Sequence, residues 1–94
     1  MAQRSLIFRV HAIERMFQRG IRVEEVRLLI EKGEVIESYP DDNPYPSRLI
    51  LGWHEGRPLH AVVADPMERN ETIIITIYHP DPERWDNDFK RRKA

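Results

Sequence analysis

Two kinds of hydrophobic periodicity divide the chain. Between residues 11 and 33 apolar side chains recur every three or four positions, which predicts two helices over about 11–19 and 23–32. Gly20 and Gly33 follow the last periodic positions and end these helices. Residues 5–10 come before the first helix and are either a short strand or an extended lead-in.

From Glu34 onward the period changes to two, and β-branched and aromatic residues gather in short runs. These runs predict four strands over residues 35–39, 48–54, 59–64 and 72–78. We expect a three-residue hairpin at 55–57, because a two-residue loop would mix the apolar faces of the flanking strands. With the longer loop, one covered face holds Leu49, Leu51, Trp53, Leu59, Ala61, Val63, Ile73, Ile75 and Ile77.

The end of the last strand is followed by a helix signal. Asp81 is suited to an N-cap and Pro82 to the first helical position, so a third helix is predicted over about 82–92, docked through Trp85 and Phe89. The expected architecture is α+β: two N-terminal helices packed on a four-stranded antiparallel β-meander, followed by a C-terminal helix. With 94 residues, the chain is expected to form one domain over residues 1–94.

Composition narrows the function classes. The chain has no cysteine, which excludes disulfides, thiolate metal sites and a thiol nucleophile. Its apolar runs are far shorter than the roughly 18 residues of a membrane span, so we expect no membrane association and a cytoplasmic protein. The four histidines and four glycines lack the spacing of metal-binding or phosphate-loop motifs, so neither a metal nor a cofactor is expected.

Charge is distributed unevenly, although the net charge is only -1. Residues 1–22 hold five arginines against the single acid Glu14, and residues 85–94 hold four basic residues against two acids. The segments between these ends are acidic. Both ends of the chain are therefore basic, and if they meet in space they form a patch that could bind phosphate.

The first candidate for chemistry is the polar side of the first helix. His11 and Arg15 are four residues apart and share one helix face, which Arg19 continues. An arginine can hold a phosphate bidentately while a nearby histidine gives or takes a proton. The alternative is an ordinary solvated helix face.

The second candidate is the sheet face that the helices do not cover. The expected register places five polar side chains there, namely Arg48, His54, His60, Thr76 and Tyr78. Basic groups and a stacking tyrosine suit a bound RNA segment. The alternative is an ordinary half-exposed face, in which His60, between Leu59 and Ala61, is a buried histidine with satisfied hydrogen bonds.

Motifs along nearly the whole chain resemble a known family. They are His11-Ala12, Arg15, Arg19-Gly20-Ile21, Val23-Glu24-Glu25-Val26, Gly33 to Pro40, Pro44-Tyr45-Pro46-Ser47, Gly56-Arg57-Pro58-Leu59-His60, Val62, and Tyr78-x-Pro80-Asp81-Pro82-x-x-Trp85. By these residues the chain resembles the family called domain of unknown function 4258. That family has been grouped with RelE-like toxins and with barnase-like and EndoU-like ribonucleases, whose core places helices before a four-stranded antiparallel sheet.

The resemblance implies a small metal-independent endoribonuclease, or a relative that has lost the activity, as the toxin half of a toxin–antitoxin pair. Its partners would be RNA and a small antitoxin protein, and its reaction would be attack of an RNA 2'-hydroxyl on the adjacent phosphate. The implied catalytic residues are His11 and His60 for proton transfer and Arg15 for the phosphate. Arg19, Arg48 and Tyr78 would hold the substrate.

A non-catalytic interaction module is the competing hypothesis. Tyr39, Tyr45 and Trp53, with the proline-rich loop at residues 40–47, would form a surface for a partner chain. Alternatively, two copies would pair through an exposed strand edge as a homodimer.

Overall fold

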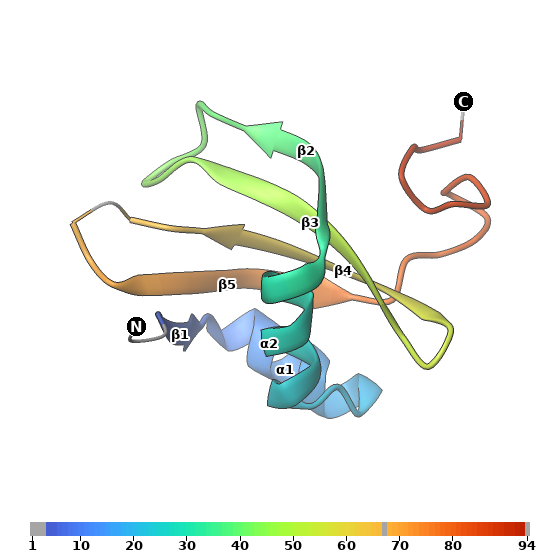
Figure 1. Cartoon of the computed structure of the whole chain (residues 1–94), viewed down its shortest axis with the longest axis horizontal. Coiled ribbons are helices and arrows are strands. Elements are labelled where there is room, and N and C mark those ends of the chain that lie inside the picture. Colours follow the sequence, from blue (N-terminus) through green and yellow to red (C-terminus); the bar gives the residue numbers. More distant parts are fainter. Residues whose placement is uncertain (1–3, 67, 94) are drawn as a thin grey trace.

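The computed structural model describes residues 4–66 and 68–93 and shows a five-stranded mixed sheet with two helices. In spatial order the strands run β1-β5-β4-β3-β2. Both helices lie together, and the C-terminal segment, which continues in red beyond the end of β5, lies away from them (Figure 1). The elements are β1 (Ser5–Phe8), α1 (Val10–Arg19), α2 (Val23–Lys32), β2 (Glu34–Tyr39), β3 (Ser47–His54), β4 (Arg57–Ala64) and β5 (Glu71–Tyr78).

The helices cover one sheet face. From α1, Ala12 is fully buried and Met16 packs beside it, while α2 contributes Val26 and Leu29. On the sheet side this core contains Ile50, Leu59, Ala61, Val63, Ile74 and Ile77. Gly52 lets α2 lie close to β3, because a Cβ at this position would come within 2.5 Å of the Leu29 side chain. The two predicted helices are confirmed, with Gly20 ending α1 at φ 65°.

The prediction of four purely antiparallel strands is wrong. Residues 5–8 form β1, which pairs in parallel with β5 from Ser5↔Glu71 to Phe8↔Ile74. Four residues are too few to show which distant strand they will join, and a parallel partner requires a crossover that the sequence pattern does not reveal. Leu6 and Phe8 reach the core from this strand.

The predicted three-residue hairpin is also wrong. His54 pairs with Arg57, so the loop is Glu55-Gly56, and both loop residues have positive φ (51° and 77°) as a type I' turn requires. Leu51 therefore lies opposite His60. Leu51 shares one sheet face with Leu49 and Trp53. Leu59, Ala61 and Val63 lie on the other face. Both sheet faces are covered, so both are apolar, and hydrophobicity alone did not determine the register.

The predicted C-terminal helix does not form. Asp81 caps a turn, because its carboxylate accepts the Glu83 N–H at 2.9 Å and its carbonyl accepts the N–H groups of Arg84 and Trp85. The chain then turns back at Phe89 (φ 60°) until Trp85 and Arg92 form an isolated β-bridge. Residues 79–93 pack against the sheet face opposite the helices, where Trp85 is only 5% exposed. Packing of Trp85 and Phe89 against the sheet outweighs the local helix signal at residues 81–82.

Among residues 4–66 and 68–93, no helix has the length and apolar character needed to cross a bilayer.

Candidate functional site

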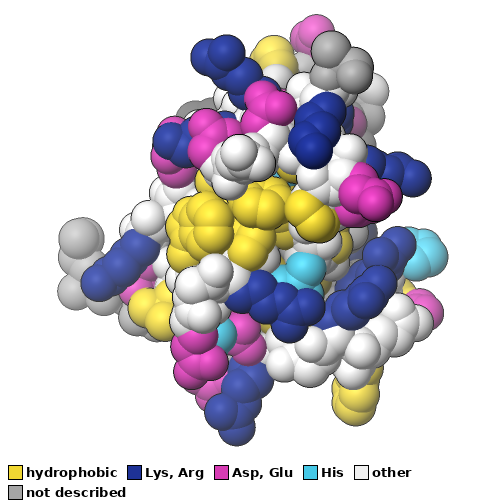
Figure 2. Space-filling model, turned by 90° about the vertical axis from the view of Figure 1, so that its right-hand side faces the viewer, with side chains coloured by type: hydrophobic (Ala, Val, Ile, Leu, Met, Phe, Trp, Pro, Cys, Tyr) yellow, Lys and Arg dark blue, Asp and Glu magenta, His cyan; other side chains and the backbone are white. Residues whose placement is uncertain are grey.

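A cleft with several arginines lies where α1, the end of β5 and the C-terminal segment meet. It has a volume of about 630 Å³. Arg15 and Arg19 come from α1, and the remaining lining residues are Tyr78, His79, Asp81, Arg84, Trp85 and Arg92. Four arginines thus face one aspartate. Figure 2 looks onto this end of the molecule and shows Lys and Arg side chains gathered around a histidine, beside an apolar surface. We call this site the cationic cleft.

The four arginines are not equally available. Arg92 donates to Glu37 at 2.6 Å and lies over the Trp85 ring, while Arg84 is 3.9 Å from Asp81. Arg15 and Arg19 form no ion pair with any residue in the described part of the chain. An anion entering the cleft would therefore meet two guanidinium groups, one helical turn apart, that no residue among 4–66 and 68–93 pairs.

His79 is the cleft histidine, and its ring is held by the backbone. Its Nδ1 lies 3.0 Å from the Pro58 carbonyl oxygen. Since a carbonyl oxygen only accepts, Nδ1 carries the proton of the neutral ring and Nε2 remains as a proton acceptor. The side chain is half-buried. In the sequence, His79 is only the residue that follows the last predicted strand. Its position next to Tyr78 is the signal that could have placed it in the cleft.

His60 is buried beneath the C-terminal segment. Its ring is 0% exposed, its Nε2 donates to the Phe89 carbonyl at 2.9 Å, and its Nδ1 accepts from the Tyr78 hydroxyl at 3.3 Å. Trp85 packs edge-on at 4.5 Å. Burial lowers the pKa of His60, against the opposing hydrogen bond to Phe89. His60 is thus a neutral core histidine, and both of its ring nitrogens are engaged inside the protein.

An acidic side chain helps to anchor the C-terminal segment. Glu37 on β2 accepts from the Tyr39 hydroxyl and from Arg92, each at 2.6 Å. Burial raises the pKa of Glu37, but these two hydrogen bonds outweigh it and keep the pKa below its usual value. Lys90 adds an ion pair with Glu34 at 3.1 Å. These contacts hold the segment that supplies one wall of the cationic cleft.

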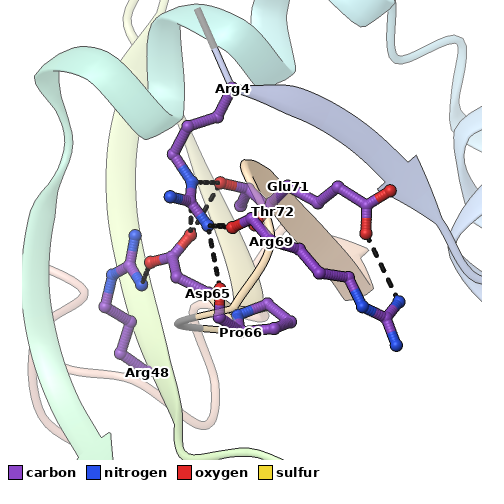
Figure 3. Close-up of polar contacts among 7 residues, drawn as sticks. All are labelled: Arg4, Arg48, Asp65, Pro66, Arg69, Glu71 and Thr72. Carbon is purple, nitrogen blue, oxygen red and sulfur yellow. Dashed lines mark hydrogen bonds and ion pairs between the residues drawn. The ribbon is translucent and has the colours of Figure 1, made fainter.

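Arg48 lies in a different polar network, shown in Figure 3. It pairs with Asp65, whose other oxygen accepts from Thr72 at 2.6 Å and lies 3.5 Å from Arg4. Arg4 also donates to the Thr72 hydroxyl and to the carbonyl of Arg69, both at 3.1 Å, which ties β1 to the β4–β5 loop. Thr72 is the second residue of β5 and Tyr78 the last, so the two lie about 20 Å apart along the strand. Arg48 therefore does not join the cationic cleft.

The residues singled out in the sequence are thus brought together only in part. Arg15, Arg19 and Tyr78 line the same cleft, whereas Arg48 and His60 lie elsewhere. His11 is exposed and lies one helical turn before Arg15 on α1, on the same helix face but outside the lining of the cleft. Arg84 and Arg92 were not predicted, because the expected helix placed them on a different path.

The fold and the cleft define a small α+β protein with two helices on a mixed sheet and an arginine-lined cleft at one end of that sheet. The chain belongs to the family described as domain of unknown function (DUF4258), whose model matches residues 8–79. No curated protein and no solved structure matches the chain. Arg15, Arg19, Tyr78 and His79 lie within the family match, while Arg84 and Arg92 belong to the C-terminal segment that follows it.

Proposed function

We propose that the protein is a small metal-independent endoribonuclease that binds single-stranded RNA in the cationic cleft. The observation that carries the proposal is the placement of Arg15 and Arg19, both without an ion pair in the described residues, in one cleft with the oriented ring of His79. Guanidinium groups match phosphate geometry, and the unprotonated nitrogen of a neutral histidine ring can accept a proton. Arginine supplies the positive charge that a metal ion provides in other nucleases.

In the proposed reaction, Arg15 and Arg19 hold the phosphate oxygens of one phosphodiester. The Nε2 atom of His79 takes the proton of the 2'-hydroxyl, and the 2'-oxygen forms a bond to phosphorus. Negative charge on the five-coordinate phosphorus is stabilised by the arginines. The bond to the 5'-oxygen then breaks, and that oxygen takes a proton from the imidazolium of His11. The products are a 2',3'-cyclic phosphate and a 5'-hydroxyl.

This assignment changes the roles that the sequence suggests. His79 takes the place of His60, because the nitrogens of His60 are both engaged in the core. Arg48 is not part of the proposal, since it pairs with Asp65. Tyr78 keeps a substrate-binding role in the wall of the cleft. His11 and Arg15 keep the roles that the resemblance implied.

The test is cleavage of end-labelled single-stranded RNA in the presence of EDTA. We expect cyclic-phosphate products from the native chain and a loss of about 100-fold or more in rate for His79→Ala, as for removal of a general base. Arg15→Ala and Arg19→Ala should each weaken RNA binding. Arg27→Ala is the matched control, because it removes an exposed arginine of α2 outside the cationic cleft. Intact RNA at a large excess of protein, or equal rates in His79→Ala and Arg27→Ala, would contradict the proposal.

A homodimer is the second candidate, favoured by an apolar stripe on α1. Val10, Ile13 and Phe17 are exposed by 69%, 45% and 87% at helical spacing. A net charge of -1 gives little repulsion between two copies, so we expect the second copy to be the occupant of this stripe. Light scattering of the purified chain tests this: a dimer that Phe17→Glu converts to a monomer supports it. A monomer at high concentration contradicts it, and a small antitoxin protein then becomes the alternative occupant.

A further inference from the structure

Trp53 is an exposed aromatic ring in a fixed position. Its side chain is 56% exposed, whereas the other tryptophan, Trp85, is 5% exposed. The ring is supported at its side by Phe89, with centroids 5.8 Å apart and planes at 76°. A large aromatic surface left in water but held in place is unfavourable for solubility and typical of a binding surface.

A pocket of about 520 Å³ has Trp53 among its lining residues. It forms because the pairing of β2 with β3 begins at Glu34↔Leu51, which leaves residues 52–54 of β3 without a partner in β2. Leu28, Leu29 and Leu59 contribute apolar surface to the pocket. Its polar side chains are Glu25, Lys32, Glu34 and His54. An apolar interior with a few polar groups suits a flat ring that has hydrogen-bonding edges.

The pocket lies near the cationic cleft. Trp53 is paired with Pro58 across the β3–β4 hairpin, and the Pro58 carbonyl accepts the hydrogen bond of His79. Trp53 and His79 are therefore about two strand spacings apart, or roughly 10 Å. In Figure 2 the apolar surface and the basic side chains lie side by side at this end of the molecule. A single strand with a phosphate in the cationic cleft would carry a neighbouring base to Trp53.

We propose that the pocket beside Trp53 is a nucleobase subsite, in which a base of single-stranded RNA stacks on the Trp53 ring. This inference rests on the proposed function for its source of ligand. Glu34 pairs with Lys90, and Oε2 of Glu25 accepts the Arg22 N–H at 2.8 Å. Oε1 of Glu25 is therefore the acceptor that favours a base with an exocyclic amino group, such as adenine, over uracil. Stacking supplies affinity and the Glu25 carboxylate supplies the preference.

The test is fluorescence titration with three oligoribonucleotides of equal length: oligoadenylate, oligouridylate and an abasic ribose-phosphate chain. We expect oligoadenylate to quench the fluorescence and to bind about ten-fold more tightly than the abasic chain. Trp53→Ala should remove that advantage and leave the affinity for the abasic chain unchanged. Trp53→Phe should retain part of it. Ile7→Ala is the control, since it removes an exposed apolar side chain on β1, outside the pocket and the cationic cleft.

The outcomes separate this inference from the proposed function. If the abasic chain binds as tightly as oligoadenylate and Trp53→Ala binds both normally, the nucleobase subsite is wrong while the cationic cleft stands. If no oligonucleotide binds, both fail. If oligouridylate binds as tightly as oligoadenylate but Trp53→Ala weakens both, stacking is retained and the preference for amino-bearing bases is wrong.

Discussion

The imidazole of His60 and the backbone carbonyl of Phe89, 29 residues apart in the chain, are joined by a 2.9 Å hydrogen bond across the sheet face opposite the helices. Nδ1 of the same ring accepts from Tyr78, and Trp85 covers it edge-on. A single buried side chain thus links the central strand β4 to β5 and to the C-terminal segment. This arrangement gives His60 a structural role, which is to hold the C-terminal segment on the sheet.

Replacing His60 by alanine should destabilise the protein. The substitution leaves a cavity beneath Trp85 and removes partners from the Tyr78 hydroxyl and the Phe89 carbonyl. We expect a loss of about 2–4 kcal/mol in the free energy of unfolding, measured by urea denaturation. The C-terminal segment should also become more sensitive to protease than in the native chain. An unchanged denaturation midpoint would show that the segment is held without this contact.

Stability should also fall with acidification in a window set by His60. Its pKa is lowered by burial in the folded state, so the unfolded chain binds the proton more readily. The contribution is complete above the ordinary histidine pKa of about 6.5 and is lost as the pH falls from there toward the folded pKa. Denaturation at several pH values should show this decline, and His60→Phe should flatten it. A decline confined to the range below about 4.5 would instead indicate the carboxylates of Glu37 and Asp65, whose pKa values are also lowered.

The β3–β4 hairpin offers a test of its two-residue turn. Glu55 has a φ of 51°, a conformation that costs energy for glutamate and that asparagine adopts more easily. Glu55→Asn should therefore stabilise the protein by about 0.5–1 kcal/mol. Thermal denaturation measures the change, with Glu68→Asn as the control in another loop. A destabilised Glu55→Asn variant would argue for a longer loop.

Asp65 holds the network that attaches β1 to the rest of the sheet. It accepts from Thr72 and pairs with Arg48 and Arg4, and its removal would leave the Thr72 hydroxyl without an acceptor. We expect Asp65→Ala to lose about 1–3 kcal/mol of stability. Hydrogen exchange should show faster exchange of the β1 amides than in the native chain. Asp41→Ala is the control, since Asp41 is an exposed residue of the loop before β3. Equal protection of β1 in both variants would contradict this role.

The sequence determined the two helices and the alignment of Arg15 with Arg19 on one helix face. Helical periodicity and terminal glycines are local properties, and they predicted α1 and α2 closely. Arg15 and Arg19 are four residues apart, so any helix containing both places them on one face. Alternation likewise predicted the strands β2 to β5, because each strand shows its own period of two.

Only the tertiary structure decided what lies opposite those arginines. The parallel pairing of β1, the two-residue turn at residues 55–56 and the irregular C-terminal segment depend on partners that are far away in the chain. Because the segment covers the second sheet face, it buries His60 and brings Arg84 and Arg92 to the cleft. Local patterns indicate which residues prefer burial. Long-range packing determines which residues cover them.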